Sequence, residues 1–223
     1  MLDQATLQLL RDSLRPLLEG TLQGTIPLTV ISFVLGLVLA LVIALMRLSP
    51  VAPLQAAARA YVSVIRGTPL LLQLFIIYYG LPSLGLTINS FPSAVIAFTL
   101  NVGGYASEIV RAAILAVPRG QWEAAATVGM NDATTLRRIV LPQASRVAVP
   151  PLSNTLIALV KDTSLASTIQ VTELLRKAQE AAAPTYQFFA LYSLAAVYYW
   201  VICLALSFTQ SRLETRLDRY VAV

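Results

Sequence analysis

The side chains that could do chemistry in this sequence are few, and most lie inside long apolar runs. Residues 161–164 read Lys-Asp-Thr-Ser within such a run. An ionisable side chain in a membrane span costs roughly 2.5–3.5 kcal/mol, so Asp162 should face a cavity or a partner. It could neutralise the ammonium group of a substrate, or it could be a structural charge at a span end, with Lys161 extending outward. Adjacent helical positions point about 100° apart, so the two charges need not pair.

A second polar group surrounds a proline at residues 66–69, which read Arg-Gly-Thr-Pro. Pro69 removes a backbone donor and biases Thr68 away from helical angles. Irregular backbone at membrane depth is tolerated where it lines a cavity, and transporters use such breaks to bind substrate carboxylates. The alternative is a simple kink near the inner end of a span. The candidates for a substrate path in this segment are Gly67, Thr68 and Pro69.

Gln73, Asn101 and Glu108 are further polar residues in apolar runs. Asn101 and Glu108 are seven residues apart, so they share one face of a helix. Both could line a path, or Glu108 could pair with Arg111 at i+3 as a structural bridge, which we favour for Glu108. Together with Asp162 and Lys161, these three complete the predicted substrate path.

The most polar stretch between apolar runs is residues 123–142, EAAATVGMNDATTLRRIVLP. Two short helices fit it, at about 121–128 and 132–139, separated by the helix-stopping Gly129. Asp132 can cap the second helix through its side chain, and Pro142 should break the chain before the next apolar run. An ordinary charged loop is the alternative, but it gives no reason for this pattern.

Several kinds of chemistry are absent from the sequence. It has no histidine and a single cysteine, Cys203, so neither a transition-metal site nor a disulfide framework is expected. It has no G-x-x-x-x-G-K-[ST] loop to hold ATP phosphates. We therefore predict no catalytic residue, metal or cofactor in the chain. The net charge of +5 is spread over loops between apolar runs, which argues against nucleic-acid binding.

The composition places these residues in a lipid bilayer. Apolar residues make up 57% and charged residues 12%, about half the usual charged share, and the mean hydropathy is +0.72. The uncharged runs 20–46, 67–107 and 181–211 each exceed the ~20 residues that a helix needs to cross a bilayer. The chain is predicted to be an all-α polytopic membrane protein, with a soluble helical bundle as the alternative.

The predicted domain organisation is a transmembrane domain over residues 22–210, between an amphipathic helix at 1–21, lying on the membrane surface, and a charged tail at 211–223. The five predicted spans are about 22–46, 60–81, 92–117, 147–169 and 187–210, with a polar loop at 118–146. Five spans put the termini on opposite sides. With residues 123–142 in the cytoplasm, that side holds ten Arg and Lys residues against four, so the N-terminus should be outside and the C-terminus inside.

The stretch at 123–142 resembles the EAA motif of bacterial ABC-importer permease subunits. Glu-Ala-Ala, Gly129, nine residues and Ile-x-Leu-Pro match its consensus positions at the right spacing. RGTPLLLQLFIIYYGLP (66–82), YASEIVRAAI (105–114) and LSNTLIALVKDTSLASTI (152–169) are similar to permeases for polar amino acids such as histidine, glutamine, arginine and cystine. Within that family, GQWEAAATVGM, RLSP (47–50) and PPLSN look most like the L-cystine permeases.

This resemblance implies a type I ABC importer permease fold, and it also assigns a function. The chain would be the membrane-spanning subunit of an ATP-driven importer for polar amino acids, with L-cystine as a candidate substrate. Residues 121–138 would form the coupling helix that fits a cleft on a cytoplasmic ATPase. The residues expected at this docking surface are Glu123, Ala124, Ala125, Gly129, Arg137, Arg138 and Pro142.

The resemblance also implies partners in the bacterial cytoplasmic (inner) membrane. They are a cytoplasmic ABC ATPase dimer that holds ATP and Mg²⁺, an extracytoplasmic amino-acid-binding protein, and a second copy of the chain or a paralogous permease. No nucleic acid is expected. Two other classes stay open at this point. One is an ion-coupled secondary amino-acid transporter, in which Lys161 and Asp162 would carry protons, and the other is a membrane scaffold.

Overall fold

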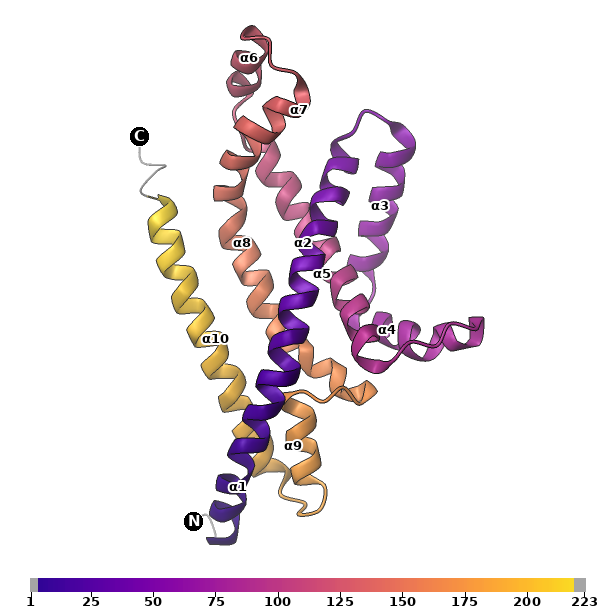
Figure 1. Ribbon diagram of the computed structural model, residues 1–223, viewed down its shortest axis with the longest axis vertical. Coiled ribbons are helices and arrows are strands. Elements are labelled where there is room, and N and C mark those ends of the chain that lie inside the picture. Colours follow the sequence, from indigo (N-terminus) through magenta and orange to yellow (C-terminus); the bar gives the residue numbers. More distant parts are fainter. Residues whose placement is uncertain (1–3, 219–223) are drawn as a thin grey trace.

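The computed structural model describes residues 4–218, which contain helices, turns and irregular connections but no strand. Residues 1–3 of the predicted N-terminal segment and residues 219–223 of the predicted tail lie outside the described residues. Figure 1 shows an elongated molecule with most of its long helices running along the same axis. The prediction of an all-α protein is confirmed over the described residues.

The first long element is one continuous helix. It consists of α1 (Gln4–Gly20), a π-helical turn (Thr21–Thr25) and α2 (Ile26–Leu48), 45 residues in all. Leu17 of α1 is completely buried against α9 and α10, which explains why this segment does not form a separate surface helix. The π turn, closed by the Ile26 amide on Thr21 O, accommodates the missing amide of Pro27. The boundary predicted at residue 21 therefore falls inside a helix.

The span predicted at 60–81 is a broken helix pair that begins earlier. α3 (Ala52–Gly67) is followed by α4 (Leu70–Phe75), a π turn (Ile76–Gly80) and a 3-10 helix (Leu81–Leu84), at an angle of 105° to α3. Thr68 and Pro69 have extended backbone angles, as the proline predicts.

α5 (Ser90–Leu115) is the central helix of the molecule and packs against α2, α3, α4 and α8. Phe98, Val102 and Ala106 recur every four residues on its surface and are buried in the largest apolar cluster. This apolar stripe packs α5 against its neighbours. It therefore also fixes the directions in which the polar side chains of α5 point.

The polar loop predicted at 118–146 is largely helical. α6 (Arg119–Thr127) is followed by one continuous helix made of α7 (Asp132–Thr135), a π turn (Leu136–Val140) and α8 (Leu141–Asp162). The prediction that Pro142 breaks the chain is wrong. The Leu141 amide donates to Leu136 O in the π turn, and this irregular turn directly before Pro142 accommodates its missing amide.

The chain continues beyond Asp162 as a 3-10 helix (Thr163–Ile169), α9 (Leu174–Ala182) and α10 (Phe188–Asp218). Glu173 caps α9, accepts from the Arg176 amide at 2.6 Å and from the Tyr199 hydroxyl at 2.7 Å, and is completely buried. Burial raises the pKa of Glu173, and these hydrogen bonds oppose the rise. α10 includes residues 211–218, so the described part of the predicted tail is helical.

Three helical stretches among the described residues are long and apolar enough to cross a membrane. They are Gln4–Leu48, Ser90–Leu115 and Phe188–Arg216, and the bent pair of α3 and α4 makes a fourth if it counts as one span. α8 carries Arg146, Lys161 and Asp162 and is not among them. The count of five spans stays a prediction.

Gly24 provides a test of how α1–α2 packs on the segment before α9. A Cβ atom at Gly24 would lie 2.1 Å from Thr172 O and 2.6 Å from Glu173 Cα, and backbone atoms cannot rotate aside. We expect Gly24→Ala to destabilise the purified protein by at least the ~1–3 kcal/mol of an overpacked core, seen as a lower thermal unfolding midpoint. Gly120→Ala is the matched control, because nothing lies within 4 Å of its Cβ position. Equal midpoints would contradict the packing.

Candidate functional site

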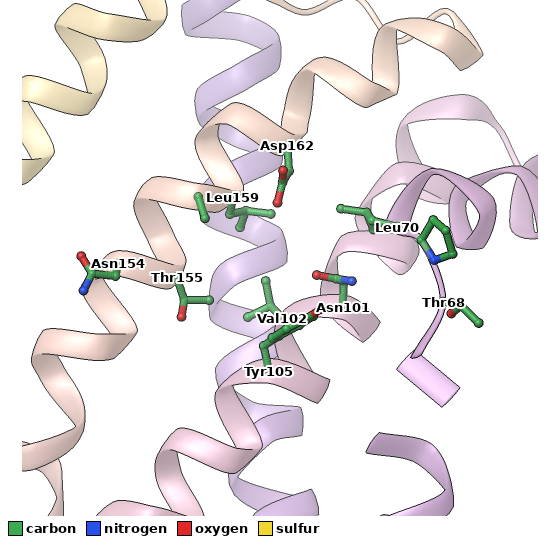
Figure 2. Close-up of a pocket in the computed structure, with 11 residues that line it drawn as sticks. Thr68, Leu70, Asn101, Val102, Tyr105, Asn154, Thr155, Leu159 and Asp162 are labelled. Carbon is green, nitrogen blue, oxygen red and sulfur yellow. The ribbon is translucent and has the colours of Figure 1, made fainter. Parts of the chain in front are cut away.

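A cavity of about 460 Å³ lies between α5, α8 and the break that follows α3. Figure 2 shows the side chains that surround it. Asp162 is the one charged residue among those that line it. The lining residues are Thr68, Pro69, Leu70, Asn101, Val102, Tyr105, Asn154, Thr155, Ala158, Leu159 and Asp162.

Asp162 is the last residue of α8, and its half-buried carboxylate points toward the space between α8 and α5 (Figure 2). The structure gives this carboxylate no hydrogen bond or ion pair within residues 4–218, although the charge of Lys161 acts on it through space. A carboxylate without direct donors in a cavity can accept hydrogen bonds from a cationic ligand. The arrangement therefore suits an ammonium group.

Four of the eight predicted path residues line this cavity, namely Thr68, Pro69, Asn101 and Asp162. The other four, Gly67, Gln73, Glu108 and Lys161, are not among its lining residues. Spacing alone could not separate the two groups, because both lie in the same polar interruptions of apolar runs. The contacts of Gln73, Glu108 and Lys161 in the structure differ from one another.

Gln73 stabilises the break between α3 and α4 and does not line the cavity. Its buried Nε2 lies 2.8 Å from Ile65 O, 3.1 Å from Thr68 O and 2.9 Å from Thr68 Oγ1. The Thr68 hydroxyl in turn donates to Val64 O at 2.8 Å. The hydrogen of that hydroxyl is therefore used within the protein, although Thr68 borders the cavity.

Glu108 forms the ion pair predicted with Arg111, at 3.2 Å, and a second one with Arg47 at the end of α2. The Gln55 amide donates to Arg47 O at 3.3 Å, which adds α3 to the same network. Arg47 was not predicted, because the two residues are 61 positions apart and only the packing of α2 on α5 brings them together. The Glu108 carboxylate thus links α5 to α2, and the Arg47 carbonyl extends the network to α3.

Lys161 is exposed and borders a different pocket, between the end of α8 and α10, lined in part by Tyr199 and Trp200. The roughly 100° step between adjacent helical positions therefore separates it from Asp162. The two charges lie on different faces of α8.

Sequence reasoning missed several lining residues that periodicity could have found. Tyr105 follows Asn101 by four positions on α5, and Thr155 precedes Asp162 by seven on α8, so each shares a face with a predicted residue. Asn154 accepts from Gln210 Nε2 of α10 at 3.1 Å.

The predicted docking residues gather at the end of the molecule that carries α6 and α7 (Figure 1). Ala125 is buried beneath this surface, next to the half-buried Trp122, which packs on the end of α5. Gly129 has the left-handed φ of 76° that ends α6, as predicted, and Val128 beside it is 74% exposed. The exposed members of the predicted set are Glu123, Ala124, Gly129, Arg137, Arg138 and Pro142.

The predicted helix cap is one residue out of place. Asn131, not Asp132, is the N-cap, and its side chain accepts from the Thr134 amide at 2.9 Å. Asp132 is already the first helical residue, where its charge complements the helix dipole instead.

Comparison with known proteins shows that the chain matches a family of transport proteins over most of its length. Residues 21–219 match the family described as binding-protein-dependent transport system inner membrane component. The chain is 60% identical over 179 residues to the L-cystine transport system permease protein TcyB of Bacillus subtilis (strain 168), covering 80% of this chain and 76% of that protein. It is 41% identical over 162 residues to the glutamine transport system permease protein GlnP of Escherichia coli (strain K12), covering 72% and 74%.

Two solved structures have the same fold. The crystal structure of an amino acid ABC transporter with histidines matches with a TM-score of 0.88 and 36% identity, over 97% of this chain and 99% of that one. The inward-facing MetNI methionine ABC transporter matches with a TM-score of 0.71 over the same shares of the two chains. At 20% identity, the second likeness concerns the fold alone.

The cap assignment can be tested by amide hydrogen exchange. We expect Asn131→Ala to speed exchange at the start of α7, because losing an N-cap costs about 1 kcal/mol, or roughly fivefold in a local opening equilibrium. Asp132→Ala, the adjacent control, should leave the Thr134 amide bonded and change exchange less. The reverse order would show that Asp132 is the cap.

Proposed function

We propose the function of this chain from the premise that it belongs to the family of binding-protein-dependent transport system inner membrane components. Membership makes it a membrane-spanning permease subunit of an ABC importer, a transport subunit without catalysis of its own. The proposal adds the cargo, which is a polar amino acid, with L-cystine as the first candidate. The 60% identity to a relative named for L-cystine transport supports that choice.

The observation that carries the amino-acid proposal is the Asp162 carboxylate in its cavity. Every α-amino acid has an ammonium group, and a carboxylate that accepts a hydrogen bond from it forms a strong, charge-assisted contact. The cavity volume of about 460 Å³ lies within the range of small-molecule sites. An ammonium group that enters the membrane loses its hydrogen bonds to water, and the Asp162 carboxylate would replace them.

The same geometry argues against the ion-coupled alternative. That alternative treats Lys161 and Asp162 as a proton-carrying pair, but the two residues border different pockets and so do not form a pair. The family premise also assigns energy coupling to ATP rather than to an ion gradient. We therefore infer that a separate cytoplasmic ATPase dimer binds and hydrolyses ATP with Mg²⁺.

The docking surface proposed for this ATPase is the exposed side of α6 with Arg137 and Arg138. The small side chains of the alanines at 124 and 126 would let the ATPase approach the backbone of α6 closely. Glu123 and the two arginines offer charged contacts around them. A second copy of the chain or a paralogous permease would complete the path, and an extracytoplasmic binding protein would deliver the substrate.

The proposed orientation places α6 and the C-terminal end of α10 in the cytoplasm and the start of α1 outside. Figure 1 supports it, because α6 and the start of α1 lie at opposite ends of the molecule. The excess of Arg and Lys residues toward the α6 end follows the positive-inside rule.

Uptake in proteoliposomes tests the substrate site. With the ATPase and the binding protein present, wild type should accumulate L-cystine only when ATP is supplied. Asp162→Asn keeps the size of the side chain but removes the charge, so we expect uptake to fall about tenfold or more. Lys161→Gln, one residue away but outside the cavity, should stay within about twofold of wild type. An unchanged Asp162→Asn rate would remove Asp162 from the path.

Co-purification tests the docking surface. Glu123→Lys reverses an exposed charge on α6, and we expect it to lower recovery of the ATPase about tenfold, because like charges would then face each other in a cleft fitted to the wild-type residue. The control is Asp12→Lys on α1, an exposed residue that makes the same charge change at the opposite end of the molecule. Equal loss in both variants, or in neither, would contradict docking at α6.

A further inference from the structure

Arg66 is a cation that the proposed function leaves unused, and it lies next to the cavity without being one of its lining residues. It is the penultimate residue of α3, two positions before Thr68, which lines the cavity. Its guanidinium carbon lies 5.3 Å from the ring centroid of Tyr105, another lining residue. The guanidinium therefore makes a cation–π contact with an aromatic residue that lines the cavity.

No acid in the described part of the chain forms an ion pair with Arg66, and its side chain is exposed. Its charge instead acts on another cation, Arg47. Arg66 follows the start of α3 at Ala52 by fourteen positions, about 21 Å along the helix, and directly precedes the break. An arginine within a membrane span is costly unless a carboxylate, a ligand or the water of a cavity compensates its charge.

We propose that Arg66 binds the carboxylate of the transported amino acid while Asp162 binds its ammonium group. This inference rests on the proposed function and deepens it. Arg66 comes from the end of α3, next to the lining residues Thr68 and Tyr105, whereas Asp162 comes from the end of α8. Figure 2 shows Asp162 and the segment that carries Thr68 on different elements around the cavity.

The other donors near the α3 wall are poorly suited to this role. The Thr68 hydroxyl donates to Val64 O, and the Gln73 amide faces three oxygens within the break. The Thr155 hydroxyl donates to Pro151 O. The Asn101 amide and the Tyr105 hydroxyl are neutral. Arg66 alone offers a planar fork of N–H groups that matches both oxygens of a carboxylate.

The pairing gives the cavity a selectivity that Asp162 alone would lack. A single carboxylate accepts any small cation, including amines. A cation placed on the facing wall adds affinity only for ligands that also carry an anionic group, so the site selects zwitterions. L-Cystine and other α-amino acids fit this pattern, whereas their decarboxylated amines do not.

The test compares L-cystine with cystamine, which is L-cystine with each carboxylate replaced by hydrogen. Equilibrium binding is measured on the purified permease–ATPase complex in lipid nanodiscs. We expect Arg66→Gln to weaken L-cystine binding about tenfold or more and to leave cystamine within about twofold. Arg66→Lys, which keeps the charge but not the fork, should weaken L-cystine by an intermediate factor. Asp162→Asn should weaken both ligands.

Arg59→Gln is the matched control, because Arg59 is an exposed arginine on the same helix, seven positions or about 10 Å along α3 farther from the lining residue Thr68 than Arg66 is. It should bind both ligands as wild type does. An Arg66→Gln variant that loses both ligands equally, or neither, would overturn the inference. If Asp162→Asn changes neither ligand while Arg66→Gln still loses L-cystine selectively, Arg66 keeps its role and the proposed ammonium site falls. Failure of wild type to bind L-cystine would overturn both assignments for this substrate.

Discussion

A broken helix at membrane depth exposes backbone oxygens, and the Gln73 side chain compensates for the break between α3 and α4. Its amide nitrogen reaches the carbonyls of Ile65 and Thr68 and the Thr68 hydroxyl. Without such a partner, each unsatisfied group would cost several kcal/mol in a bilayer. The cavity depends on this arrangement, because a straight α3–α4 helix would carry the lining residue Leu70 and the rest of α4 away from α5. One buried glutamine therefore fixes the lining residue Thr68 without lining the cavity itself.

The second consequence of the fold is a physical link between the docking surface and the cavity. Residues 132–162 form one continuous helix, so Arg137 near its start and Asp162 at its end belong to the same element. Its 31 residues span about 46 Å. Because Pro142 enters this helix without breaking it, a displacement at the docking end would reach Asp162 with no loop between them. The helix would then transmit a movement of the docking surface directly to Asp162. It could bend at its π turn and at its two internal prolines, Pro150 and Pro151.

Local chemistry in the sequence was sufficient for several features of the fold and the site. The extended backbone at Thr68, the left-handed Gly129 and the orientation of Asp162 toward a cavity follow from proline, glycine and carboxylate properties that depend on few neighbours. Features that depend on distant packing did not follow. The burial of Leu17 on α9 makes α1 continue into α2, and the contact of α2 with α5 gives Glu108 its second arginine. Neither partner is visible from the spacing of residues along one helix.

The two membrane carboxylates show why burial and partners, rather than position in an apolar run, separate structural from functional charges. Glu108 and Asp162 look alike in the sequence, since each is an acid within a predicted span. Glu108 lies between Arg47 and Arg111, so its charge is compensated within the protein and would gain little from a ligand. Asp162 accepts no hydrogen bond among residues 4–218 and faces a cavity, so its compensation must come from water or from what enters. Arg66 lies beside the same cavity without an ion pair among the described residues. Under the proposal above, Arg66 would bind the carboxylate of the ligand whose ammonium group Asp162 binds, so the ligand would compensate both charges at once.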